Sequence, residues 1–153
     1  MKKIGLILVL ILVFCFCIGY AEAQTHFVPL DIYIYPLNDD GQRPYDPTPY
    51  LNPGQPFDLV SDIFIQSTDG NGFWINDIVV LISNLSSTRI YHRQIFAIMN
   101  GGQGCWITVV NIIPPGNLWP GRVYKLTIKY RGLDPNGIAF IKSQSTKFMV
   151  LWE

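Results

Sequence analysis

The chain has 153 residues, of which 49% are hydrophobic and 14% charged, and its formal net charge at pH 7 is zero. This length and apolar content suit one domain with a sizeable core. Because the charges balance and no basic run occurs, the sequence gives no indication of a nucleic acid or an anionic membrane as partner.

The N-terminus has the pattern of a secretory signal peptide. Two lysines precede the uncharged apolar run Ile4–Tyr20, and Ala21 and Ala23 follow it. A basic start, an apolar middle and small residues before a cut predict cleavage after Ala23, so we expect a periplasmic or extracellular protein with no membrane contact once processed. An uncleaved anchor is the alternative, because the apolar run approaches the ~20 residues that span a bilayer.

The predicted mature chain, residues 24–153, keeps a single cysteine, Cys105. It therefore cannot form an internal disulfide. Cys105 adjoins Trp106 in an apolar stretch, and this setting favours a buried, unreactive thiol over a reactive one or an intermolecular link.

Short strands separated by turn residues follow one another along this mature chain. No segment in it has a capped 3.6-residue period, so we predict an all-β fold. It would be a single antiparallel two-sheet sandwich of about seven strands. Alternation or short apolar runs place the strands at Phe27–Tyr35, Phe57–Gln66, Ile78–Ile82, Ile90–Met99, Cys105–Ile113, Leu118–Tyr130 and Ile138–Trp152, the last as one strand or two.

Prolines mark two features near the start of this series. Pro29 lies in the first predicted strand and indicates an edge position, because proline has no N–H for the ladder. The proline-rich segment 36–56 cannot continue a helix or pair as a central strand, and loops beyond ~12–15 residues are usually functional or disordered. Tyr45 and Tyr50 within it indicate partial docking on the domain surface.

A Pro-Gly turn, Pro120–Gly121, leads into a strand with apolar and polar residues in alternation. The residues expected to face inward begin at Tyr124, just after the turn. At this position a sandwich can use a tyrosine hydroxyl to hold a crossing loop by a hydrogen bond. We therefore predict structural roles for Leu118, Pro120, Gly121 and Tyr124.

The pattern L-x-P-G-x-x-Y-x-L-x-I, from Leu118 to Ile128, resembles the turn and penultimate strand of fibronectin type III and related bacterial immunoglobulin-like domains. In that family the leucine packs beneath the tyrosine ring, so the resemblance implies such a contact between Leu118 and Tyr124. It also makes Trp74 a candidate for the family's core tryptophan. The resemblance says little about function, because the sandwich hosts many roles.

The titratable residues give little support to an enzyme. His26 and His92 lack the further ligands that a copper site needs, and no G-x-S-x-G motif is present. Cys105 and His92 form a conceivable pair across neighbouring strands, but the apolar setting of Cys105 does not favour a thiolate. The one mature glutamate is Glu153, so no facing pair of glutamates exists for glycoside hydrolysis. We predict no catalytic residue and no cofactor.

Calcium is a separate question, because Asp69, Asn71 and Asp77 supply oxygen ligands in or near one turn. They do not match a twelve-residue calcium loop, which carries a terminal bidentate glutamate. Turn chemistry explains them without a metal, and no metal is predicted.

Aromatic residues are the remaining candidates for ligand binding. Exposed aromatics can stack on sugar rings or anchor a protein partner. Trp119 lies in a turn and is expected to face solvent, and Tyr45, Tyr50 and Trp74 are further candidates.

These observations predict an exported, non-catalytic binding or structural domain with a protein or glycan partner at the cell surface. Three specific alternatives stay open. One is a carbohydrate-binding module that uses Trp119, Trp74 and the loop tyrosines. Another is a subunit of a surface assembly, docked through its edge strands or the 36–56 segment. The third is a small secreted enzyme inhibitor that presents this segment.

Overall fold

The computed structural model describes residues 26–66 and 73–152. The predicted signal peptide and the calcium candidates Asp69 and Asn71 lie outside these residues. Within the described part of the chain, no helix is long and apolar enough to cross a membrane.

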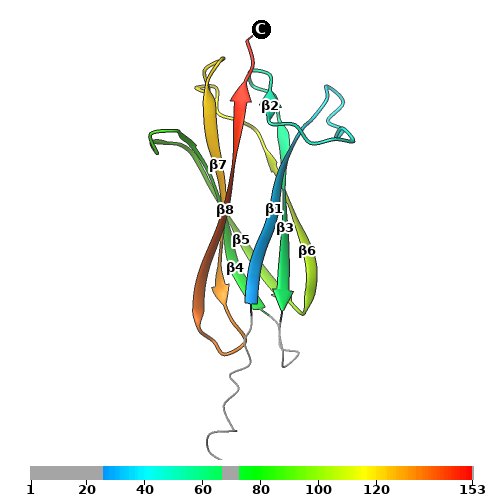
Figure 1. Ribbon diagram of the computed structural model, residues 1–153, viewed down its shortest axis with the longest axis vertical. Helices are drawn as coiled ribbons and strands as arrows, with labels where there is room; N and C mark the ends of the chain where they lie inside the picture. The colour runs from blue at the N-terminus through cyan, green and yellow to red at the C-terminus, as the bar shows by residue number, and fades with distance from the viewer. Residues whose placement is uncertain (1–25, 67–72, 153) are drawn as a thin grey trace, which may run out of the picture.

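The described residues form a two-layer β-sandwich, which confirms the predicted fold class (Figure 1). One layer is a three-stranded sheet in the order β1–β3–β6, and the other is a five-stranded sheet in the order β2–β8–β7–β4–β5. Neighbouring strands are antiparallel except for the short parallel pair β2–β8. The strands are β1 His26–Pro36, β2 Tyr50–Leu51, β3 Phe57–Gln66, β4 Phe73–Asn84, β5 Arg89–Gly101, β6 Gly104–Ile112, β7 Val123–Leu133 and β8 Ala139–Val150.

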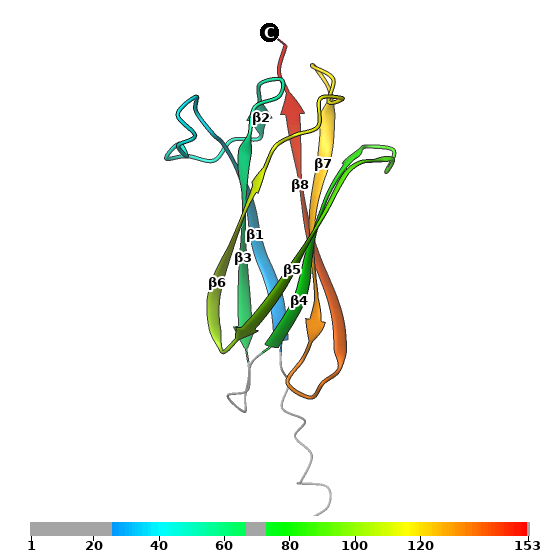
Figure 2. The same ribbon diagram turned by 180° about the vertical axis from the view of Figure 1, so that it is seen from behind.

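The two sheets take different strands because of what each strand can bury. β4 contains the long apolar run predicted for a deep strand, and it lies between β7 and β5. Its Val79 is buried although it points away from the other sheet. β1, which contains Pro29, is an edge strand as predicted. Figure 2 shows β5 running obliquely across the other side of the molecule to meet β6 at the lower end.

The proline-rich segment is more ordered than the sequence suggests, because it contains β2. Leu51 is almost completely buried, and its carbonyl accepts a 2.8 Å hydrogen bond from the Leu151 N–H. Pro49 and Pro53 flank this pair of residues and limit the strand to two positions. The segment therefore carries the chain from the edge of the three-stranded sheet to the edge of the five-stranded sheet. The C-terminal range forms one strand, β8.

Inward-facing side chains fill the space between the sheets. Near one end, Phe27 packs against Phe73, Tyr130 and Phe140 with ring centroids 5.1–5.7 Å apart. Phe148 lies at the other end, 5.6 Å from Tyr124 and 5.9 Å from Phe57 between centroids. Tilted and edge-on ring pairs at these distances add to the apolar burial that holds the sheets together. The remaining core side chains are Ile34, Leu51, Leu59, Ile63, Ile65, Ile75, Ile78, Val80, Ile82, Val110, Ile112, Leu118, Leu126, Ile128 and Val150.

A small group of hydroxyls interrupts this apolar core. The Ser61 hydroxyl donates a 2.7 Å hydrogen bond to the Gln144 side-chain carbonyl, across the two sheets. The buried hydroxyls of Thr108 and Tyr130 make no well-directed hydrogen bond. Burial raises the pKa of Tyr130, while the nearby hydroxyls of Ser61 and Thr108 partly oppose this rise.

Tyr124, by contrast, has well-placed partners in the turn that precedes β7. Its hydroxyl accepts a 2.7 Å hydrogen bond from the Trp119 N–H and lies 3.4 Å from the Trp119 carbonyl, to which it can donate. Leu118 is buried in the same core, and Gly121 takes a left-handed backbone conformation with φ of 71°. A side chain at Gly121 would also meet the ring of Trp152, which packs on this glycine. The turn is thus tied to the core at one side and to the end of the chain at the other.

The two buried tyrosines of β7 give a matched stability test. Tyr124→Phe removes the partner of a backbone N–H and should lower the free energy of unfolding by about 1–2 kcal/mol. Tyr130→Phe removes a hydroxyl without a well-directed partner and should change it by less than ~0.5 kcal/mol. Urea denaturation of both variants measures the difference. Equal losses would contradict the hydrogen-bond assignment.

Tyr130 also predicts how stability depends on alkaline pH. Its pKa is raised in the folded protein above the ordinary value of 10.0, so above that pH the unfolded chain loses its proton first. The folded state then binds more protons than the unfolded state, and stability should fall as the pH rises beyond about 10. Tyr130→Phe should reduce this alkaline loss in thermal unfolding followed against pH, whereas an unchanged slope would show that Tyr130 does not contribute.

Candidate binding surfaces

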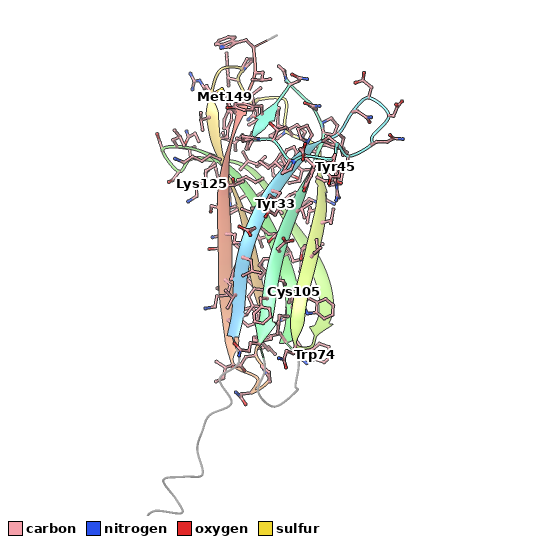
Figure 3. All side chains as sticks on the ribbon, turned by 45° about the vertical axis from the view of Figure 1, so that its right-hand side comes forward. Tyr33, Tyr45, Trp74, Cys105, Lys125 and Met149 are labelled. Atoms are coloured by element: carbon pink, nitrogen blue, oxygen red, sulfur yellow. The ribbon has the colours of Figure 1, made fainter. Side chains whose placement is uncertain are left out.

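The four aromatic residues predicted to bind ligand are all exposed, but they do not form one surface. The exposed fractions are 67% for Trp119, 46% for Trp74, 96% for Tyr45 and 51% for Tyr50. Figure 3 shows Trp74 at the lower end of the sandwich and Tyr45 near the upper end. These four side chains therefore do not form a single platform for a glycan.

Trp74 also does not occupy the core position that the family resemblance suggested. Its neighbours Phe73 and Ile75 are the buried residues, with exposed fractions of 2% and 1%. Strand alternation forces this result, because three successive apolar side chains cannot all point inward.

The outer face of the three-stranded sheet carries aromatic and polar side chains that sequence reasoning did not single out. In β1, Tyr33 and Tyr35 share one parity, opposite to that of the buried Ile34. Strand register places Tyr35 beside Asp58 and then Asn111, and places Tyr33 beside Val60 and then Val109. We call this surface the tyrosine face, defined by Tyr33, Tyr35, Asp58, Val60, Asp62, Ile107, Val109 and Asn111.

At one end of the tyrosine face, side chains fix one another in place. Arg43 donates hydrogen bonds from Nη2 and Nε to Asp58 Oδ2, at 2.7 and 3.2 Å. Asn111 Nδ2 donates to the other oxygen of Asp58 at 3.1 Å, and the guanidinium of Arg43 lies 5.2 Å from the ring centroid of Tyr35. Arg43 belongs to the proline-rich segment, so these contacts also hold that segment against the sheet.

Tyr33, on the edge strand β1, has a protonated phenol at neutral pH. Desolvation and the adjacent carboxylates of Asp31 and Asp62 raise the pKa of Tyr33. A protonated phenol can donate a hydrogen bond to a ligand and can also accept one. Neither Asp31 nor Asp62 is in a salt bridge with another residue in the described ranges.

A shallow hollow adjoins the edge of the tyrosine face. It has a volume of about 250 Å³ and lies between Tyr33, the segment Pro47–Pro49 and Thr146 of β8. Small-molecule pockets usually have ~300–1,000 Å³, so this hollow could take one ring or side group but could not enclose a larger ligand.

The opposite outer face, on the five-stranded sheet, is basic, which the sequence did not reveal. Lys125 and Lys129 of β7 and Lys147 of β8 point outward, on the parity opposite to the buried Tyr124, Leu126, Ile128 and Phe148. No run of lysines occurs in the sequence because these residues are separated by core positions. Strand pairing brings them together, so a basic patch exists although the sequence contains no basic run.

Cys105 is exposed, not buried as predicted. It lies on the outward parity of β6, because Trp106 takes the partly buried inward position and its indole N–H donates a 3.1 Å hydrogen bond to the Gly102 carbonyl. His92 belongs to β5 in the other sheet. Cys105 and His92 therefore point from different sheets and do not form a nucleophile–base pair.

The described residues also offer no calcium site around Asp77. Its two carboxylate oxygens accept hydrogen bonds from Arg131, at 2.6 Å, and from Gln94, at 3.3 Å. No group of three or more His, Cys, Asp or Glu side chains in the ranges 26–66 and 73–152 could hold a metal ion.

Comparisons with known proteins support the fold and leave the family open. No protein-family model matches the sequence, and no curated protein matches it. Among solved structures, the chain is similar to the crystal structure of the C-terminal domain of Wzt, with a TM-score of 0.60 and 16% sequence identity. The alignment covers 88% of this chain and 81% of that chain. At this identity the similarity shows a shared fold, and membership of the fibronectin type III family stays a prediction.

The position of Cys105 gives a direct chemical test. A thiol reagent such as dithionitrobenzoate should label the processed, folded protein at this residue without denaturant, because the side chain faces solvent. Absorbance of the released thiolate measures the reaction, and Cys105→Ser should abolish it. Labelling that requires unfolding would place Cys105 inside the protein.

Proposed function

We propose that this chain is an exported, non-catalytic carbohydrate-binding domain and that its tyrosine face binds the glycan. One observation carries the proposal. Two tyrosines lie on the outer side of one sheet, beside a polar group of Arg43, Asp58 and Asn111 whose geometry is already fixed.

The chemistry of this face matches the two sides of a sugar ring. A pyranose ring presents C–H groups on one side, which can pack on an aromatic ring, and hydroxyl groups around its edge. Asp62 and Asp31 can accept hydrogen bonds from hydroxyls, and the phenol of Tyr33 can donate or accept. Val109, which is exposed, lies in the same row as Tyr33 beyond the buried Val60 and adds apolar surface to the face. A sugar stacked on Tyr33 would therefore have polar partners within reach around its edge.

The fixed polar group favours binding energetically. Ordering a free side chain at an interface costs about 0.5–1.5 kcal/mol, and this cost lowers the affinity. Arg43, Asp58 and Asn111 already hold one another, and the pair Arg43–Asp58 has a separation of 2.7 Å. Less side-chain freedom is then lost when a ligand arrives.

Other features are consistent with this role. The tyrosine face is open along the strands, so a polymer could lie across it without threading through a closed cavity. The C-terminal domain of Wzt shows that the same sandwich exists as a domain of a larger protein, and that similarity concerns the fold alone. The signal-peptide pattern at residues 1–23 supports a location outside the cytoplasm, where surface glycans are found.

Binding to an array of neutral oligosaccharides, followed by calorimetry on the best ligand, tests the proposal. Tyr33→Ala should weaken that affinity about five- to tenfold, since an aromatic contact contributes about 1 kcal/mol or somewhat more. Tyr35→Ala should have a similar effect, because it removes both a ring and the contact to Arg43.

Trp119→Ala is the matched control, since it removes an exposed aromatic ring that lies outside the tyrosine face. Its affinity should remain within about twofold of the unchanged protein, a difference well below 1 kcal/mol. The proposal fails if no glycan binds, or if Trp119→Ala abolishes binding while Tyr33→Ala retains it. Thermal unfolding of each variant shows that the fold is intact.

A further inference from the structure

The charged side chains of the two sheets are segregated by sign. The strands and loop of the three-stranded layer carry six aspartates and one arginine, namely Asp31, Asp39, Asp40, Asp46, Asp58, Asp62 and Arg43. The strands of the five-stranded layer carry seven basic residues and one aspartate, namely Arg89, Arg93, Lys125, Lys129, Arg131, Lys142, Lys147 and Asp77. A formal net charge of zero for the chain hides this separation.

Three lysines define the centre of what we call the basic face. Lys125 of β7 is directly opposite Lys147 of β8 in the strand register. Directly opposite residues have their Cβ atoms about 4.5–5.5 Å apart. Lys129 lies four residues further along β7 on the same side, about 13 Å away at the usual rise per residue. Figure 3 shows Lys125 at the margin of the molecule, away from Cys105 on the other sheet.

This arrangement does not serve the stability of the fold. Like charges directly opposite one another on neighbouring strands destabilise a sheet. Lys125, Lys129 and Lys147 are in no salt bridge with another residue in the described ranges, and the nearby Asp77 is already paired with Arg131 at 2.6 Å. An anionic partner would remove the repulsion between Lys125 and Lys147.

The residues between the lysines indicate what kind of anion fits. Thr127 and Ser145 lie opposite each other in the next row, and their hydroxyls share a 2.9 Å hydrogen bond. Ser143 lies opposite Lys129. The face therefore alternates cations with hydroxyls, which suits a ligand that carries both acidic groups and hydroxyl groups.

We propose that the basic face binds an acidic glycan, in which carboxylate groups contact Lys125, Lys147 and Lys129 and sugar hydroxyls contact the serine and threonine row. Single-stranded nucleic acid fits less well, because its binding sites interleave cations with aromatic rings on which bases stack. The outward residues of β7 and β8 between the lysines are Thr127, Ser143 and Ser145, and the exposed ring of Phe96 lies on β5, two strands away from β7. With Arg89 and Arg131 on the same side, the face has enough cations for an anionic membrane as well. The hydroxyls of Thr127, Ser143 and Ser145 between the cations favour a glycan, and the vesicle measurement below distinguishes the two. This inference does not rest on the tyrosine face, which lies on the other sheet.

The probe is polygalacturonate, which carries a carboxylate on each sugar, and it is added to the complete processed chain. Dextran, an uncharged polymer, is the control ligand. Calorimetry at low salt should show polygalacturonate binding and no dextran binding at this face. The affinity should fall as salt is added, because the screening length shortens from ~30 Å at 0.01 M to ~8 Å at 0.15 M ionic strength. The double variant Lys125→Ala/Lys147→Ala should weaken binding about tenfold.

Lys142→Ala is the matched control, because it removes an exposed lysine from the same strand but from the opposite parity. It should change the affinity less than about twofold. The double variant should be as stable as the unchanged protein, or more stable, since it removes a repulsive pair. Thermal unfolding checks this, so a loss of binding cannot be attributed to misfolding.

Three results would overturn the proposal. The first is no binding of polygalacturonate by the unchanged protein. The second is an equal loss in Lys142→Ala and in the double variant, which would show a non-specific charge effect. The third is tighter binding to oligothymidylate or to phosphatidylglycerol vesicles than to polygalacturonate. Tyr33→Ala should leave polygalacturonate binding unchanged. The proposal for the basic face can therefore fail while the proposal for the tyrosine face holds, and the reverse is also possible.

Discussion

The structure depends on one constraint, the two-residue period of a β-strand whose inward side chains must be buried against a second sheet. In β7 the inward positions are apolar or aromatic without exception from Tyr124 to Tyr130, and they pack with Phe57, Phe148 and their neighbours. Because burial fixes every second residue, the outward residues are free to vary. A sandwich made in this way presents two separate outer faces, and in this protein they differ in both chemistry and charge.

The connection between the sheets links the core to the tyrosine face. β1 ends at Pro36, and the segment that follows crosses to β2, where Leu51 is buried against the end of β8. Since both ends of this segment are anchored, the intervening Arg43 is held close enough to reach Asp58 on β3. The length of the proline-rich segment, which makes it unusual for a hairpin connection, is thus explained by a path between layers.

The sequence predicted the structure well where every second residue of a strand was clearly apolar. The fold class, the edge position of β1 and the deep position of β4 followed from proline placement and apolar patterning. Prediction failed where both parities were apolar. Hydrophobic residues follow one another at Cys105, Trp106 and Ile107, and another follows at Val109. The pattern therefore could not show that Trp106 points inward and Cys105 outward. The same ambiguity affected Trp74.

The tyrosine face and the basic face were missed for a different physical reason. The outward parity of Tyr33 and Tyr35 is visible in the sequence, but the neighbours Asp58 and Asn111 come from strands that are distant along the chain. Lys125 and Lys147 are likewise neighbours only through the pairing of β7 with β8. Strand order and register determine such surfaces, and no local signal in a single sequence specifies them. The position of Tyr124 after a tight turn was an exception, because its partner Trp119 is five residues away.

The central claim is that two outer faces of one sandwich recognise glycans. Backbone amide chemical shifts of the isotope-labelled protein, followed while a neutral oligosaccharide that it binds is added, test this claim most directly. The account predicts that the largest changes fall in β1, β3 and β6 around Tyr33 and Asp58, and that an acidic oligosaccharide instead affects β7 and β8 around Lys125. Changes confined to the loop around Trp119, or one set of changes shared by both ligands, would contradict it.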